Sequence, residues 1–200
     1  LRVLVAGELF RAELTVDLIA LFRLSKDGRH RVLPEDFEDP QFQSWRQARD
    51  SDLRHDLDLL VSAALDGEKR SAASYTLRVG DVPKSRWERS PELPLEAALQ
   101  FLGRPLKVQV ENARNDRAFL LAALPEPDRR RLEDAEERGW LEMDHCGGLP
   151  EMKERLKELK VSGKWRRSEL ERRFWVFDSD ALRPPEEQAD GDLKYFPSAP

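Results

Sequence analysis

In the C-terminal half of the chain, strand-like and helix-like segments alternate regularly, and this alternation restricts the folds that the chain can adopt. Short apolar runs of strand length occupy residues 107–110, 140–143 and 174–177, and helix-like segments over residues 116–124 and 149–159 separate them. This order predicts a parallel sheet whose strands are joined by helical crossovers. The third run, Phe-Trp-Val-Phe, is apolar throughout, which is typical of a strand that is buried on both faces.

The alternation sets the expected limits of the domain. Residues 91–182 are predicted to form an α/β domain with a mostly parallel, Rossmann-like sheet, which begins with a short helix over residues 95–102. The last residues, 183–200, contain four prolines and several acids, and are expected to form an irregular tail.

The N-terminal part follows a different pattern. Apolar side chains recur at three- and four-residue spacings over residues 8–24 and 53–67, which predicts two amphipathic helices. Prolines and charges over residues 25–50, between these helices, indicate a long surface connection with a short helix near Trp45. Residues 73–79 alternate weakly, as in a strand. A proline-containing stretch with little apolar periodicity follows and indicates a boundary. Residues 1–90 are therefore predicted to be a mainly helical domain of unknown role.

The composition excludes several classes of protein. No apolar run approaches the roughly 18 residues that a membrane-spanning helix needs. The single cysteine, Cys146, cannot form an intrachain disulfide or a zinc site of several thiolates. We therefore expect a cytoplasmic protein that makes no membrane contact. The formal charge of −5, from 34 basic and 39 acidic side chains, argues against binding nucleic acid by overall charge. Such binding would need a local basic segment or metal ions.

Acidic side chains follow two of the predicted strands. Glu111 comes directly after the run at residues 107–110, and Asp178 and Asp180 come after the third run. Ligands of open α/β sheets collect at the carboxyl ends of the strands. If the two strands are parallel neighbours, these three carboxylates converge, and their mutual repulsion is best offset by a divalent cation such as Mg²⁺ or Mn²⁺.

A structural interpretation stands beside this one. A single acid after a strand is often only a turn residue or a helix cap, which applies to Glu111 taken alone. Asp116 lies where the next helix is predicted to begin, and it can serve as a cap there. The Asp-x-Asp pair is more informative, because two nearby like charges at the end of a buried strand need a reason.

These residues together resemble the Toprim domain of topoisomerases, primases and nucleases of the overcoming-lysogenisation-defect class. The likeness covers residues 104–182. It consists of a strand ending in Glu111, a helix containing Asn-Asp-Arg-Ala-Phe-Leu, the glycine-containing strand end at residues 144–148, and the apolar strand before Asp178 and Asp180.

The resemblance implies a divalent-metal-dependent nuclease. By this likeness Glu111 would act as general acid or base and would also bind Mg²⁺ (or Mn²⁺) with Asp178 and Asp180, while Asp116 is a second candidate catalytic residue. The implied partner is nucleic acid, with DNA as the expected polymer. The implied biological context is bacterial anti-phage defence or DNA maintenance.

Two departures from the family pattern affect this expectation. The family places glycine after the glutamate, whereas this chain has Asn112, a residue that tolerates left-handed backbone geometry. The family's fold also continues beyond the Asp-x-Asp, where this sequence has only the proline-containing tail. The sheet is therefore expected to be incomplete, or to be completed by another chain or a missing segment.

A basic segment precedes the Asp-x-Asp strand. Lys164, Arg166 and Arg167 flank Trp165, and such side chains supply sequence-independent contacts to phosphates. The alternative is an ordinary solvated surface, since acids and bases alternate over residues 151–158 just before it. The N-terminal domain carries no chemical motif, and its apolar positions are expected to form a core or a surface for a partner protein or a second copy of the chain.

Two rival functions remain open. An apolar strand followed by Asp-x-Asp also fits a haloacid-dehalogenase-like phosphotransferase, although that family normally has the motif on its first strand, followed by Thr or Val where this chain has Leu182. The other rival is a non-catalytic Toprim-like interaction module in a larger assembly, whose acids are structural.

Overall fold

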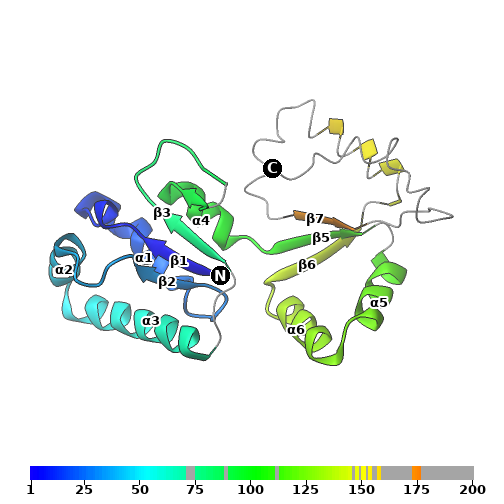
Figure 1. Ribbon diagram of the computed structural model, residues 1–200, viewed down its shortest axis with the longest axis horizontal. Coiled ribbons are helices and arrows are strands. Elements are labelled where there is room, and N and C mark those ends of the chain that lie inside the picture. The colour runs from blue at the N-terminus through cyan, green and yellow to red at the C-terminus, as the bar shows by residue number, and fades with distance from the viewer. Residues whose placement is uncertain are drawn as a thin grey trace. The chain divides into compact units, whose positions relative to one another are not determined.

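The computed structural model divides the chain into two compact units, Leu1–Gly103 and Arg104–Pro200, which are described separately (Figure 1). The structure describes residues 1–70, 75–87, 90–110, 113–145, 147–148, 150–151, 153–154, 157–158 and 173–176. Among these described residues, none of the helices combines the length and the apolar character that a membrane crossing requires.

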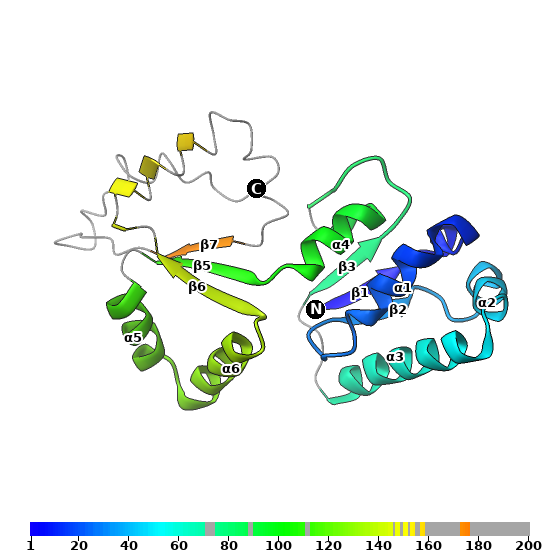
Figure 2. The same cartoon turned by 180° about the vertical axis from the view of Figure 1, so that it is seen from behind.

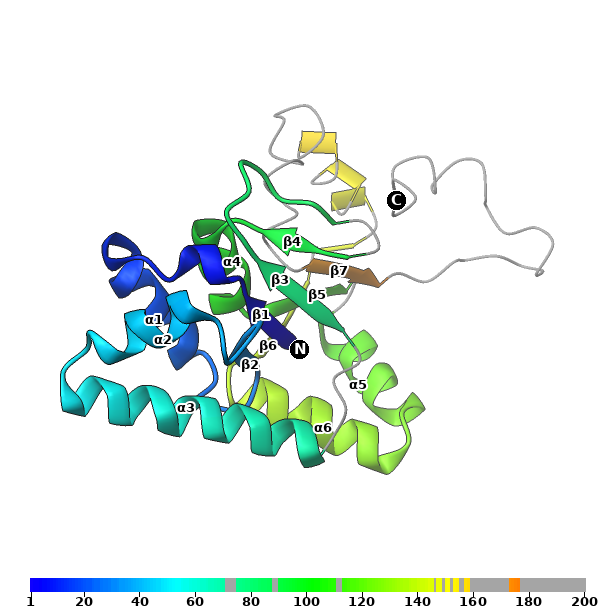
Figure 3. The same cartoon turned by 60° about the vertical axis from the view of Figure 1, so that its left-hand side comes forward.

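The first unit contains a four-stranded sheet in which every strand is parallel to its neighbours. The strands are β1 (Arg2–Val5), β2 (Arg31–Pro34), β3 (Thr76–Val79) and β4 (Glu92–Leu93), in the spatial order β2-β1-β3-β4. Figure 3 shows β4 beside β3 at one edge of this sheet. Because β2 and β3 lie on opposite sides of β1, the direction of chain winding reverses between β1 and β3.

Helices connect and cover these strands. They are the short 3₁₀ turns η1 (Gly7–Leu9) and η2 (Ala12–Leu14), and the helices α1 (Thr15–Arg23), α2 (Pro40–Gln47), α3 (Ser51–Arg70) and α4 (Leu95–Gly103). The start of α2 is encoded locally: the Asp39 side chain accepts a 2.7 Å hydrogen bond from the Gln41 N–H, and Pro40 occupies the first turn. Helix α3 packs on β2, and α1 packs on both α3 and α4.

The core of this unit lies between the sheet and the helices. Val3, Val5, Val32 and Val79 on the strands have no exposed surface, and neither has Phe22 on α1. An aromatic cluster extends this core, with Phe10 placing its ring 4.9 Å from Phe42 and 5.3 Å from Trp45. Burial of this apolar surface is the main source of stability for the unit.

This architecture corrects the expectation of a mainly helical N-terminal domain. The helix expected over residues 53–67 is α3, whereas the one expected over residues 8–24 begins only at Thr15, after the 3₁₀ turns η1 and η2. These helices cover a parallel sheet, and the connection between them contains the strand β2 beside the expected short helix near Trp45, α2. Strands β1 and β2 span four residues each, and an apolar run of that length has no periodicity that separates a strand from a buried helical turn. The boundary also lies after Gly103 instead of near residue 90, because β4 pairs with β3 and α4 packs on α1.

The second unit contains a three-stranded parallel sheet, as the alternating pattern predicted. Its strands are β5 (Leu106–Val110), β6 (Leu141–His145) and β7 (Arg173–Val176), in the order β6-β5-β7. Helices α5 (Ala113–Ala123) and α6 (Glu126–Glu137) pack against β6, and both lie on the same side of the sheet (Figures 1 and 2). The parallel α/β class is thus confirmed. The predicted tail, residues 183–200, lies outside the described residues.

Candidate functional sites at the strand ends

The three strands of the second unit end level with one another. Val110, the last residue of β5, pairs with His145 on β6 and with Val176 on β7. In the sequence, Glu111 follows Val110 directly and Asp178 follows Val176 by two positions. Strands β5 and β7 are therefore the parallel neighbours that convergence of the predicted carboxylates requires.

Most of the predicted site residues lie outside the described part of the chain. These are the candidate metal ligands and the candidate phosphate-binding residues, namely Glu111, Asp178, Asp180, Lys164, Arg166 and Arg167. Within the described residues, no group of three His, Cys, Asp or Glu side chains is arranged to hold a metal ion. The register of β5 and β7 is thus the structural information that bears on the predicted metal site.

Asp116 is described, and it lies inside helix α5. The helix begins at Ala113, so Asp116 occupies the first turn and is not the residue that precedes the helix. A carboxylate in this turn interacts favourably with the exposed N–H groups of the helix start. Next to it, Arg117 donates hydrogen bonds of 2.8 and 3.3 Å to Glu136 on α6, which raises the pKa of Arg117 and ties the two helices together.

A second carboxylate lies near the carboxyl edge of this sheet. The Gln109 side chain is only 1% exposed, and its Nε2 donates a 2.7 Å hydrogen bond to Oδ2 of Asp144 on the neighbouring strand. The backbone N–H of His145 donates to Oδ1 of the same carboxylate at 2.9 Å. Sequence reasoning included Asp144 in the segment of residues 144–148 but assigned it no role. The available signal was that polar Lys107 and Gln109 alternate with valines along β5, which places a polar group on one face of the strand.

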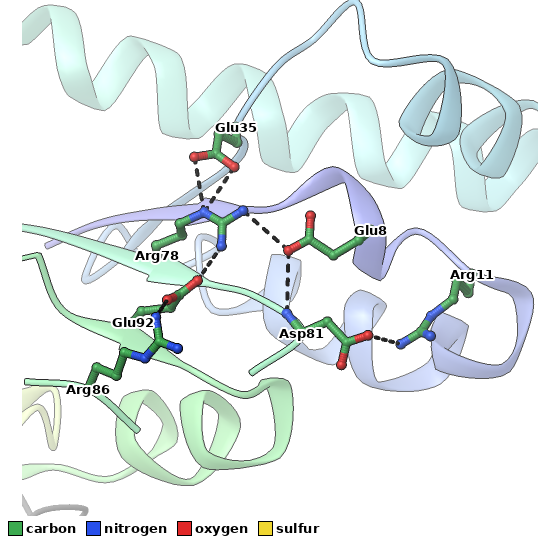
Figure 4. A network of polar contacts seen from close by, with 7 residues as sticks. All are labelled: Glu8, Arg11, Glu35, Arg78, Asp81, Arg86 and Glu92. Carbon is green, nitrogen blue, oxygen red and sulfur yellow. Dashed lines mark hydrogen bonds and ion pairs between the residues drawn. The ribbon is translucent and has the colours of Figure 1, made fainter. Parts of the chain in front are cut away.

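The first unit has its own polar cluster, centred on Arg78 of β3 (Figure 4). Arg78 Nε lies 3.1 Å from each carboxylate oxygen of Glu35, which follows β2. Its Nη2 donates a 3.2 Å hydrogen bond to Glu8, in the turn after β1, and its Nη1 donates to Glu92 on β4. The Arg78 guanidinium thus contacts β4 itself and the segments that follow β1 and β2, so it links β3 to each of the other three strands of this sheet.

Further charged groups extend the Arg78 cluster. Arg86 Nη1 lies 3.3 Å from Glu92, and Arg11 Nη2 lies 3.3 Å from Asp81 (Figure 4). The seven side chains drawn there carry four carboxylates and three guanidinium groups, so the charges nearly cancel. Three of the carboxylates accept hydrogen bonds from Arg78, so the cluster is suited to holding the strand ends together.

Electrostatics within the cluster favour the charged forms. The hydrogen bonds and charges of the surrounding glutamates raise the pKa of Arg78, led by the hydrogen bonds to Glu35. For Glu8, burial acts to raise the pKa, but hydrogen bonds from the Glu8 and Asp81 N–H groups and the charge of Arg78 lower it below its usual value. Glu8 is therefore held as a carboxylate.

Glycine at position 80 permits the close approach of these side chains. A Cβ atom at Gly80 would lie 2.5 Å from Nη1 of Arg78 and 2.7 Å from Oε1 of Glu92, closer than real contacts allow. Sequence reasoning missed the cluster because it did not assign β1 and β2. The signal was available: Glu8, Glu35 and Asp81 each follow an apolar run within three residues, by the same rule that singled out Glu111.

Comparisons of the chain with protein-family models, with curated proteins and with solved structures find no match.

Proposed function

We propose that the second unit is a Toprim-type nuclease, a phosphodiesterase that cleaves nucleic acid, with DNA as its substrate, and depends on Mg²⁺ or Mn²⁺. The observation that supports this function is the pairing of β5 with β7, in which Val110 and Val176 are level at the carboxyl edge of the sheet. In the sequence, β5 is followed directly by Glu111, and β7 is followed within four residues by Asp178 and Asp180. Ligand sites of parallel α/β sheets lie at this edge.

The donor set fits a hard divalent cation. Three carboxylates that leave adjacent strand ends would repel one another, and oxygen ligands of this kind suit Mg²⁺ or Mn²⁺. Glu111, Asp178 and Asp180 would hold the ion. When bound, the ion would stabilise negative charge on the phosphate oxygens and would offset the repulsion between the carboxylates and the substrate.

The protein residues contribute the proton chemistry and the substrate contacts. By its likeness to the Toprim glutamate that ends the first strand, Glu111, directly after β5, serves as general acid or base at the scissile phosphate. Asp116, in the first turn of α5, is the second catalytic carboxylate of this proposal. Lys164, Arg166 and Arg167 neutralise backbone phosphates, which recruits nucleic acid without reading its sequence.

A plasmid-nicking assay tests this function. The full chain is incubated with supercoiled DNA and Mn²⁺ or Mg²⁺, beside the variants Asp178→Asn and Glu111→Gln and a reaction containing EDTA. Asp128→Asn on α6 is the matched control, because it neutralises an exposed carboxylate of the same unit. We expect cleavage by the wild type and the control only. Equal cleavage by all the variants would contradict the site, and metal-independent cleavage would contradict the mechanism.

A further inference from the structure

A cavity of about 190 Å³ lies among the helices of the first unit and shares no lining residue with the Arg78 cluster (Figure 4). Its walls come from α1, α2 and α3, with Phe22, Phe42 and Leu57 exposing 0%, 5% and 3% of their surface. Val61 on α3 and Phe37 before α2 complete the apolar lining. The cavity is therefore a pocket that runs from the aromatic core to the surface, where the partly exposed side chains of Arg46 and Asp58 line its mouth.

The size and lining of this cavity suit a single aromatic ring. Apolar cavities are poorly hydrated, and one of about 150 Å³ is large enough to hold benzene. Unfilled space in a core also forfeits contacts between side chains, so a ligand that occupies it restores packing. Aromatic walls add a preference for stacked or edge-on rings.

The polar part of the lining consists of an ion pair between α2 and α3 and one amide side chain, Gln43. Arg46 Nε donates a 2.8 Å hydrogen bond to Oδ1 of Asp58, and its Nη2 donates a 2.5 Å bond to Oδ2. Both side chains remain partly exposed, at 31% for Arg46 and 47% for Asp58, so the pair lies on the solvent side of the buried phenylalanines. The third lining polar group, Gln43, donates its side-chain N–H to the Phe37 carbonyl at 2.6 Å, which holds the segment before α2 in place.

Within this ion pair, Arg46 is the group that an anionic ligand would contact. Both oxygens of Asp58 accept from Arg46, whereas the two N–H groups on Nη1 of Arg46 take no part in the pair. Asp58 also fixes the guanidinium in one orientation, so less entropy is lost when a second carboxylate binds. Guanidinium–carboxylate hydrogen bonds are among the stronger polar contacts in proteins.

We propose that this cavity binds a small aromatic carboxylate, with the ring between Phe22, Phe42 and Leu57 and the carboxylate on Arg46. The first unit is then a ligand-binding domain, a role separate from the nuclease chemistry of the second unit. The ligand class is a single ring that bears one carboxylate, because the cavity has room for little more.

Isothermal titration of the full chain with benzoate tests this assignment. Benzyl alcohol is the neutral analogue and benzylamine the cationic one. For a ligand of this size we expect a dissociation constant for benzoate on the order of 0.1–1 mM. Benzyl alcohol lacks the carboxylate that contacts Arg46, so its dissociation constant should be about tenfold higher or more. Benzylamine should bind more weakly still.

Variants of the lining locate the binding. Val61→Phe narrows the cavity and should abolish binding of all three ligands, while the double variant Arg46→Met with Asp58→Leu should bind benzoate and benzyl alcohol alike. Asp58→Asn should strengthen the binding of benzoate, because it removes the negative charge that repels the benzoate carboxylate, while the Asn side-chain oxygen can still accept from Arg46 and orient it. Arg23→Met, an exposed arginine on α1, is the matched control and should behave as the wild type.

Thermal unfolding of each variant shows whether it is folded, and a second filling variant, Leu57→Phe, replaces Val61→Phe if that protein unfolds. Saturable benzoate binding that both filling variants retain would place the ligand elsewhere and overturn the assignment. Equal wild-type affinity for benzoate and benzyl alcohol would overturn the role of Arg46. Absence of saturable binding up to about 10 mM would overturn the site as a whole.

Discussion

The buried amide of Gln109 on β5 donates a 2.7 Å hydrogen bond to the carboxylate of Asp144 on β6. The two residues are partners in the parallel register, so their side chains lie on the same face of the sheet. The contact joins a buried side chain to an exposed one. Substituting the donor and substituting the acceptor should therefore change the free energy of unfolding by different amounts.

Asp144→Ala should destabilise the protein more than Gln109→Leu does. The first change removes the carboxylate acceptor of an amide that stays buried, which costs about 1–3 kcal/mol. The second leaves Asp144, which water can solvate, and replaces the amide with an apolar group of similar size, at less than about 1 kcal/mol. Urea unfolding of the two variants and their double variant measures both values and the coupling. Equal costs would contradict the asymmetry.

Arg78→Met should lower the free energy of unfolding by about 2 kcal/mol, between the values typical of exposed and buried ion pairs. The substitution leaves Glu8, Glu35 and Glu92 close together without their shared partner, and the Glu92 side chain is only 12% exposed. Arg130→Met is the matched control, because Arg130 forms an exposed pair with Glu126 within α6. The control should change stability by less than about 0.5 kcal/mol. Chemical denaturation compares them, and similar losses would show that Arg78 does not join the strand ends.

Glu8→Gln should destabilise the protein at neutral pH but not in acid. The pKa of Glu8 is lowered below its usual 4.5 in the folded state, so its carboxylate contributes stability above pH 4.5. That contribution is lost as the pH falls through the folded pKa, where the carboxyl becomes protonated. Unfolding free energies of wild type and variant, measured from pH 7 down to acid, should converge. In an Arg78→Met background the difference at neutral pH should be smaller, since the charge and hydrogen bond of Arg78 no longer lower the pKa of Glu8.

Manganese should raise the unfolding temperature of the wild type, and EDTA should reverse the rise. A ligand that binds only the folded state stabilises it by mass action, about 2.7 kcal/mol at one hundred times the dissociation constant. Asp178→Asn should lose most of this gain, whereas Asp128→Asn should keep it. A gain that survives Asp178→Asn would indicate that the ion binds at another position, and no gain in the wild type would favour a non-catalytic module.

Joint substitution of Lys164, Arg166 and Arg167 by Gln should weaken DNA binding and make it less salt-dependent. Each lost phosphate contact reduces the slope of log affinity against log salt by about one. Arg129, Arg130 and Arg131 on α6 form a matched basic triplet for the control, and its substitution removes the same charge. Fluorescence anisotropy over a salt series separates the two. Equal reductions in slope would mean that net charge, and not this segment, governs binding.

Much of the second unit could be predicted from local sequence. Its three strands begin within one residue of the predicted positions, and α5 ends at Ala123, before Pro125, as expected. Helix α6 was not predicted, because it is highly charged and has no fully buried residue to produce a periodic signal. In the first unit, α3 followed from its apolar spacing, while β1 and β2 were too short for their period to show.

The parallel α/β character of the second unit and the positions of acids after its strands could be predicted from the sequence, because periodicity and turn residues are local properties. Which strands are neighbours became known only from the three-dimensional structure. It placed β5 between β6 and β7, brought Gln109 to Asp144, and gathered three glutamates around Arg78. Such contacts join residues as many as 70 positions apart in the chain. They depend on strand order and register, which are set by how all the helices and strands bury their apolar faces together.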